Sequence, residues 1–192
     1  MLIIADKILT QTKQLPIPLS RWAVLVRRGN ICALGPVEAL RKSYPRERTL
    51  ILHNALLMPG LVNVHAHLEL PSLQNWIESR TYASWVLDLL KMKRHLTDKE
   101  LIKSGKANIA SLIESGTTTV GEISTHGIST ALLSASGIRA QVFREIISMD
   151  PSKPLIRRMP LPLRNTSLLR FGLSPHSPHT VYEHAFSVIF YL

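Results

Sequence analysis

Two histidines separated by one small residue, His65 and His67, are the residues of this chain best suited to chemistry. They lie near the end of an apolar run, MPGLVNVHAHLEL (residues 58–70), whose alternating pattern is typical of a strand. Because alternate side chains of a strand share a face, both imidazoles are expected to point the same way. Imidazole nitrogens bind Zn²⁺ or Fe²⁺, so the pair predicts part of a metal site. Two unrelated core or surface histidines are the alternative.

Two further residues are candidates for the same site. Glu69 is expected on the face of His67, where it binds a substrate hydroxyl or amine or holds a ligand histidine; a plain surface carboxylate is the alternative. His176 follows a predicted strand in GLSPHSPHTV, residues 172–181, where two prolines stiffen the backbone; a loop histidine in water is the alternative. Asn63 is expected to pack. Weaker candidates are Glu122, His126 and His179.

The elements that must position these residues alternate between strands and helices after Gly60. This alternation predicts an α/β fold with a parallel sheet or barrel. Active sites of such barrels lie where the strands end, so His65, His67 and His176 are expected at one rim. The predicted strands are 61–67, 117–120, 138–146 and 168–173, and the predicted helices are 82–94 and 97–115.

Local signals support this alternation. Thr97 and Glu100 have the spacing of a capping box at the start of a helix, and Gly116 suits a left-handed cap at its end. The opposite face of the first strand, with Val62 and Val64, is apolar enough to pack on helices. Four prolines in residues 151–162 predict that any helix before the fourth strand is short or broken.

Residues 1–57 are predicted to form a separate region of short strands. A tight-turn signal at 27–30 joins two of them, and Pro36 suits the first turn of a short helix over 36–44. Cys32 falls in a strand-like run, where a small core residue is expected rather than a nucleophile. The predicted strands are 2–4, 22–26, 31–34 and 50–57.

Composition excludes several classes of protein. With 45% hydrophobic and 19% charged residues, the 192-residue chain fits a globular protein and not a disordered one. No apolar run approaches the roughly 20 residues that span a bilayer, so no membrane partner is expected. A single cysteine excludes an intrachain disulfide and fits the cytoplasm. The net charge of +10 suggests nucleic acid, but the basic residues are spread along the chain, and most are expected on solvated faces.

Three ordered motifs resemble the amidohydrolase superfamily, in the branch of chlorohydrolases and nucleoside or purine deaminases. They are residues 58–70, ESGTTTVGEIS at 114–124 and GLSPHSPHTV at 172–181. The form H-x-H-L-E-L resembles aminodeoxyfutalosine deaminase-like enzymes and the S-adenosylhomocysteine and methylthioadenosine deaminases. In addition, VLVRRGNICALGPVEAL, residues 24–40, is similar to the small β domain that precedes the barrel in this family.

The resemblance implies a fold, a cofactor and a reaction. Residues 1–57 would form a β-sandwich-like domain, and residues 58–192 the first half of a metal-dependent TIM-type (β/α)8 barrel. His65 and His67 would bind a divalent metal, with zinc expected and iron as the alternative, while His176 and Glu69 would contact a small-molecule substrate. A metal-activated hydroxide would then attack a purine nucleoside-like ring and release ammonia, hydrolysing a carbon–nitrogen bond that is not a peptide bond.

The resemblance also implies residues that these 192 do not contain: a further metal histidine with a proton-shuttling glutamate, another histidine and a late aspartate. A complete barrel takes ~250 residues. We therefore expect a chain truncated after the fourth barrel strand, with the catalytic residues beyond its end and no activity alone. The alternatives are a non-catalytic remnant, half of a split enzyme that self-associates or pairs with a complementing half through unpaired strand edges, and a basic nucleic-acid-binding module.

Overall fold

The computed structural model describes residues 1–72, 81–152 and 164–190. The chain divides into two compact units, Met1–Pro59 and Gly60–Leu192. Most of the proline-rich segment 151–162 lies outside the described residues, so the broken helix expected there stays a prediction.

Unit 1, Met1–Pro59, is a five-stranded sheet built around its first strand. The first strand pairs antiparallel with β2 and β3 and parallel with β5, and β4 pairs with β3. The predicted tight turn is confirmed, because Arg28 and Gly29 both have positive φ, as a two-residue hairpin turn requires. Its elements are β1 (Leu2–Ile8), β2 (Leu19–Ser20), β3 (Trp22–Arg27), β4 (Asn30–Pro36), α1 (Val37–Ser43) and β5 (Thr49–Leu57).

The core of unit 1 is small and apolar, and it is formed by Leu2, Ala23, Leu25 and Leu40. Leu40 comes from α1, which confirms the predicted short helix after Pro36. The expectation that Cys32 is a core residue is wrong: its side chain is exposed, because only the later part of β4 faces this core.

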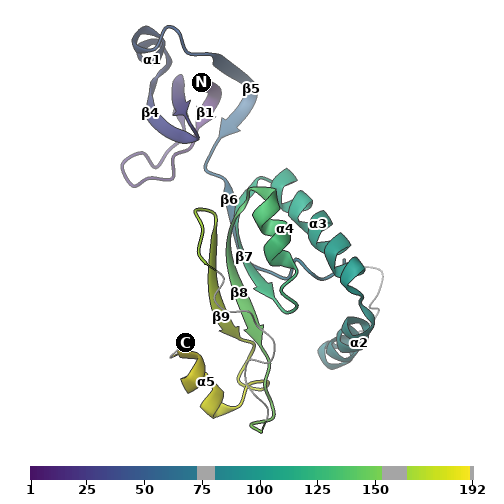
Figure 1. The fold of residues 1–192 in the computed structure, drawn as a ribbon. Coiled ribbons are helices and arrows are strands. Elements are labelled where there is room, and N and C mark those ends of the chain that lie inside the picture. The colour runs from purple at the N-terminus through teal and green to yellow at the C-terminus, as the bar shows by residue number, and fades with distance from the viewer. Residues whose placement is uncertain (73–80, 153–163, 191–192) are drawn as a thin grey trace. The chain divides into compact units, whose positions relative to one another are not determined.

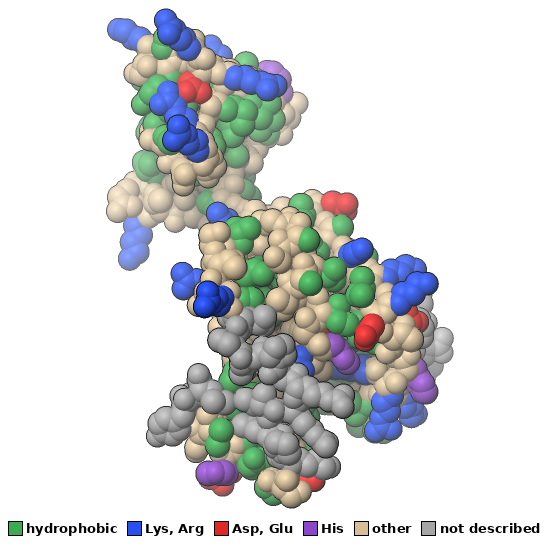
Figure 2. Space-filling model, in the orientation of Figure 1, with side chains coloured by type: hydrophobic (Ala, Val, Ile, Leu, Met, Phe, Trp, Pro, Cys, Tyr) green, Lys and Arg blue, Asp and Glu red, His purple; other side chains and the backbone are tan. Residues whose placement is uncertain are grey.

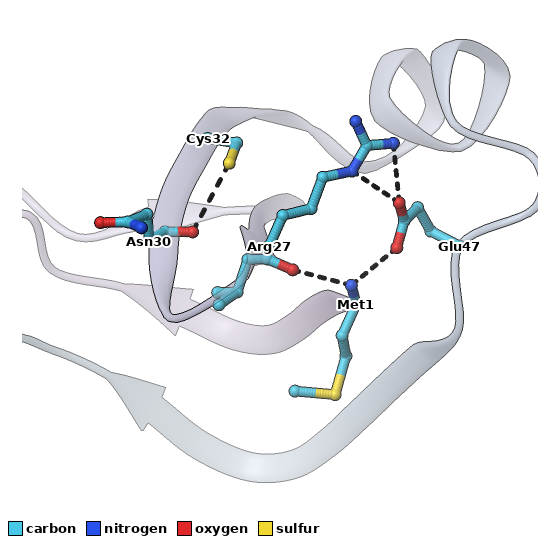
Figure 3. A network of polar contacts seen from close by, with 6 residues as sticks. Met1, Arg27, Asn30, Cys32 and Glu47 are labelled. Atoms are coloured by element: carbon cyan, nitrogen blue, oxygen red, sulfur yellow. Dashed lines mark hydrogen bonds and ion pairs between the residues drawn. The ribbon is translucent and has the colours of Figure 1, made fainter.

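A hydrogen bond and an ion pair join the first residue of unit 1 to β3 and to Glu47, which lies just before β5 (Figure 3). The Met1 ammonium donates to the Val26 carbonyl at 2.8 Å and to Glu47 Oε2 at 2.7 Å. Arg27 Nε donates to Glu47 Oε1 at 2.7 Å, and its guanidinium lies 5.1 Å from the centre of the Tyr44 ring. Hydrogen bonds from the ammonium and from Arg27 hold the pKa of Glu47 below its ordinary value. These contacts tie the start of β1 to the end of β3.

Unit 2, Gly60–Leu192, contains a parallel sheet of four strands in the order β6-β7-β8-β9 (Figure 1). Each strand pairs with the next one along the chain, as consecutive β/α units of a barrel do. The predicted α/β class with a parallel sheet is therefore confirmed. The strands are β6 (Leu61–Ala66), β7 (Thr117–Ser124), β8 (Arg139–Ile146) and β9 (Leu169–Pro175), and the helices are α2 (Tyr82–His95), α3 (Asp98–Glu114), α4 (Ser129–Ser136) and α5 (Glu183–Phe190).

Helices α3 and α4 cover one face of this sheet (Figure 1). The core between these helices and the sheet includes Ile109, Val120, Leu133 and Val142. The predicted capping box is confirmed at the start of α3, where the Thr97 amide donates to Glu100 Oε2 at 2.8 Å. The predicted left-handed glycine at its end is confirmed by a φ of +82° at Gly116.

The expectation that the apolar face of the first barrel strand packs on helices is wrong for Val62 and Val64. Their side chains are 62% and 78% exposed, so the described residues leave this face of β6 largely uncovered. β6 is also the edge strand, and pairs only with β7 within the described part of the sheet. The strand also ends at Ala66, earlier than expected. The chain then turns, and Leu68 enters the core at 3% exposure.

Candidate functional site

The two histidines lie side by side at the carboxyl end of β6. His65 is on the strand and His67 follows its last residue. Their ring centres are 5.2 Å apart, with the planes at 74° in an edge-to-face arrangement. The structure therefore brings these two side chains together, although the strand alternation that led to the expectation stops before His67.

Within the described part of the chain, His67 has a free ring nitrogen and favours the neutral form, as a metal ligand requires. Its ring is half-buried, and Nδ1 is buried without a hydrogen-bond partner among the described residues. Burial lowers the pKa of His67, against the opposing effect of the Glu145 carboxylate, and so favours the neutral imidazole. A neutral imidazole has a free lone pair for a metal ion.

His65 is held through its backbone. Asn63 Oδ1 accepts a hydrogen bond from the His65 amide at 3.1 Å. Asn63, which we expected only to pack, therefore also fixes the main chain at the first histidine.

Glu69 is buried at 2% exposure, so the surface-carboxylate alternative is wrong. Its Oε1 accepts from Ser124 Oγ at 2.8 Å and from the amide and hydroxyl of Ser129 at 3.0 and 3.2 Å. Its Oε2 accepts from the His126 amide at 2.7 Å. Burial alone would raise the pKa of Glu69, but these hydrogen bonds lower it below its ordinary value. The Glu69 carboxylate thus holds the segment between β7 and α4 next to the turn that follows β6.

Glu122 is fully buried on β7. Its Oε2 accepts from the Leu68 amide at 2.9 Å, while Oε1 has no hydrogen-bond partner among the described residues. Burial raises the pKa of this carboxyl to about 7, against a smaller lowering effect of the Leu68 amide. Burial therefore favours the protonated form of this carboxyl group.

The sequence pattern did not single out two other polar residues near the histidines. Asn108 on α3 donates from Nδ2 to the carbonyls of Leu68 and Leu70 at 2.9 and 2.8 Å. Glu145, at the end of β8, is 8% exposed and accepts from Thr125 Oγ1 at 2.7 Å. The available signal was a polar residue within an apolar helix face or strand, which is unfavourable unless it is hydrogen-bonded.

His176 lies just past the end of β9 with an exposed side chain. Its Nδ1 is 2.7 Å from Thr180 Oγ1, and its amide donates to the Ile146 carbonyl at 3.0 Å. These contacts fix the ring at the carboxyl edge of the sheet. The side chains of the weaker candidates His126 and His179 are exposed, and the His126 amide serves Glu69.

The described donors fit part of a metal site. Within residues 1–72, 81–152 and 164–190, no group of three or more His, Cys, Asp or Glu side chains is arranged to hold a metal ion. Catalytic zinc sites typically use three protein ligands. His65 and His67 thus fit two positions of such a site and leave the others to further donors.

The basic residues on the face drawn in Figure 2 do not form a single stripe. Figure 2 shows Lys and Arg side chains at many separated places on the face drawn. Across the described part of the chain, no helix combines the length and the apolar character needed to cross a membrane.

Comparison with curated proteins finds deaminases. The 5-methylthioadenosine/S-adenosylhomocysteine deaminase of Nitratidesulfovibrio vulgaris is 27% identical over 168 residues, which cover 82% of this chain and 38% of the relative. The aminodeoxyfutalosine deaminase of Nitratiruptor sp. is 30% identical over 121 residues, covering 62% of this chain and 29% of the relative. The chain thus spans less than half the length of these relatives.

Solved structures show the same fold. The Helicobacter pylori aminofutalosine deaminase in complex with methylthio-coformycin has a TM-score of 0.82 at 20% identity, covering 99% of this chain and 47% of that one. An adenosine deaminase from Xanthomonas campestris with bound zinc has a TM-score of 0.77 at 21% identity, covering 99% and 46%. The four-stranded sheet accordingly corresponds to part of an amidohydrolase barrel. A family model described as the amidohydrolase family matches residues 56–189, most of the chain, and the chain therefore belongs to that family.

Proposed function

We propose that this chain carries the first metal-binding part of an amidohydrolase that deaminates a purine nucleoside-like substrate, hydrolysing a carbon–nitrogen bond other than a peptide bond. The observation that carries the proposal is the His65–His67 pair, with ring centres 5.2 Å apart at the carboxyl end of β6. The names of the relatives, which are deaminases of nucleosides and related compounds, support the substrate class.

His65 and His67 hold a divalent metal ion in this proposal, and zinc is the ion we propose, since the Xanthomonas campestris neighbour was solved with zinc. When bound, such an ion supplies activation of water for attack on a ring carbon, with loss of ammonia. The neutral state that burial favours for His67 keeps its lone pair available.

His176 contacts the substrate in this proposal, and Thr180 orients its ring from 2.7 Å away. We assign Glu69 to the substrate site through the segment that it holds, because its carboxylate is already hydrogen-bonded to Ser124, His126 and Ser129. That segment follows the end of β7, where a barrel places its substrate loops.

We propose that residues 1–57 are the β-sandwich-like N-terminal domain of the family and residues 58–192 its partial barrel domain. We also propose that the 192 residues alone do not turn over substrate, because His65 and His67 supply two donors where about three are needed. The exposed edge of β6, with Val62 and Val64, is the surface through which the chain self-associates or pairs with a complementing half. A cytoplasmic location is proposed from the single cysteine.

The metal content and turnover of the purified 192-residue chain test this proposal. We expect weak zinc binding that falls strongly in His65→Asn and His67→Asn, and no change in His53→Asn, an exposed histidine of unit 1. We expect no ammonia release from adenosine, methylthioadenosine or S-adenosylhomocysteine. Zinc binding that is equal in all four proteins would contradict the metal pair, and steady ammonia release would contradict the inactivity of the chain alone.

A further inference from the structure

We propose that Asn108 and Glu122 are positioning residues for the His65–His67 pair. They hold the backbone directly after His67 from two sides. This inference rests on the proposed function, because it assumes that the pair binds a metal ion.

Asn108 clamps the turn from the helix side. Its Nδ2 donates both hydrogens, to the Leu68 carbonyl at 2.9 Å and to the Leu70 carbonyl at 2.8 Å. Gly105, one turn earlier on α3, lets Leu132 of α4 pack closely on this helix: a Cβ there would lie 2.5 Å from Leu132 Cδ1, and at an ordinary 3.7 Å from the Leu68 carbonyl oxygen. A single amide side chain therefore holds two carbonyl groups of the turn that follows the strand.

Glu122 holds the same residue, Leu68, from the sheet side. Its Oε2 accepts from the Leu68 amide at 2.9 Å, and the side chain is fully buried. The N–H and the C=O of Leu68 are thus both bound by side chains, one from β7 and one from α3. The Leu68 side chain, at 3% exposure, adds an apolar anchor between them.

The position of this clamp explains why it bears on the metal pair. The pairing of β6 with β7 ends at Ala66, opposite Glu122, so His67 lies beyond the last ladder partner. On the C-terminal side of His67, the clamp therefore fixes the backbone together with the buried Leu68 side chain and the hydrogen-bonded Glu69 carboxylate. Ligand orientation is sensitive to such support, and losing an outer partner typically lowers metal affinity by about 10–100-fold.

A purely structural role for Asn108 and Glu122 would give a different result. Such a role predicts lower stability on substitution, with zinc affinity unchanged in the protein that remains folded. The two roles are therefore separated by measuring affinity and stability on the same variants.

The experiment compares zinc affinity, by competition with a chromophoric chelator, with urea unfolding of the 192-residue chain. Asn108→Leu and Glu122→Leu are expected to bind zinc about ten-fold more weakly than the wild type. Glu122→Gln is expected to retain wild-type affinity, because its amide oxygen still accepts from the Leu68 amide. Ile109→Val, a core substitution next to Asn108, is the matched control: it lowers the urea midpoint and leaves affinity unchanged.

Hydrogen exchange of the peptide spanning residues 64–70 tests the clamp without metal. Faster exchange in Asn108→Leu than in Ile109→Val is expected. Equal exchange in these two variants, or wild-type zinc affinity in Asn108→Leu, would overturn the positioning role. A wild-type chain that binds no zinc, together with the expected exchange difference, would instead overturn the proposed metal pair and leave the clamp as a feature of the fold alone.

Discussion

The buried carboxyl of Glu122 makes the stability of this chain depend on pH in a defined window. Its pKa is raised from the ordinary 4.5 to about 7, chiefly by burial. Between these values the folded chain keeps the proton and the unfolded chain releases it. Because the folded state then binds more protons, the free energy of unfolding falls as the pH rises through this window. The shift corresponds to a loss of about 3 kcal/mol, at ~1.36 kcal/mol for each pKa unit.

Glu122→Gln isolates this contribution, because glutamine does not ionise and still accepts from the Leu68 amide. We expect the unfolding free energy of the variant, relative to the wild type, to rise by about 3 kcal/mol between pH 4.5 and pH 8. Urea unfolding followed by circular dichroism at constant ionic strength, with EDTA present, measures this difference. Glu114→Gln, at an exposed position of unit 2, controls for the loss of one carboxylate. A Glu122→Gln difference that is flat with pH, or that falls as the pH rises, would show that burial does not raise the pKa of this carboxyl group.

Three further outcomes follow from the structure. Gly121→Ala should lower the unfolding free energy by about 2 kcal/mol in urea, since an added Cβ overlaps the Val64 carbonyl; an unchanged midpoint would argue against this close approach of β6 and β7. The wild-type chain should self-associate by light scattering, and Val62→Thr with Val64→Thr should reduce the apparent mass; a monomeric wild type would contradict the role of the exposed edge. Despite a net charge of +10, fluorescence anisotropy should detect no DNA or RNA binding at low salt, and salt-sensitive binding would favour the nucleic-acid alternative.

Features that depend on neighbouring residues were predictable from the sequence. The capping box at Thr97 and the left-handed Gly116 follow from spacing alone, because their partners lie within one turn. The proximity of His65 and His67 was predictable for the same reason. The parallel order of the four strands followed from the alternation of strands and helices.

The support of the histidines was not predictable in this way. Leu68 is bound by Asn108 and Glu122, which lie 40 and 54 residues away along the chain. Such partners are fixed by how α3 and β7 pack, and no local periodicity encodes them. The burial of Glu69 was not predictable for the same reason. A single carboxylate after a strand is compatible with a surface position, and its hydrogen-bond donors, between Ser124 and Ser129, are brought to it only by the fold.

Val62 and Val64 illustrate a different limit. Their alternation correctly predicted a strand. Such a pattern indicates that one face of the strand is apolar, but it does not indicate which element packs on that face. On an edge strand, this face remains exposed within the described residues. The sequence therefore predicted the element and not its packing.

We propose that His65 and His67 bind one metal ion together. The most direct measurement is a zinc titration of the 192-residue chain followed by NMR of the ring carbon-bound protons of its eight histidines, assigned with single His→Asn variants. We predict that the His65 and His67 signals change together and saturate at one zinc ion per chain, while the His53 signal does not move. Signals of His65 and His67 that respond independently, or that stay unchanged while zinc binds elsewhere, would show that the two histidines do not share a metal ion.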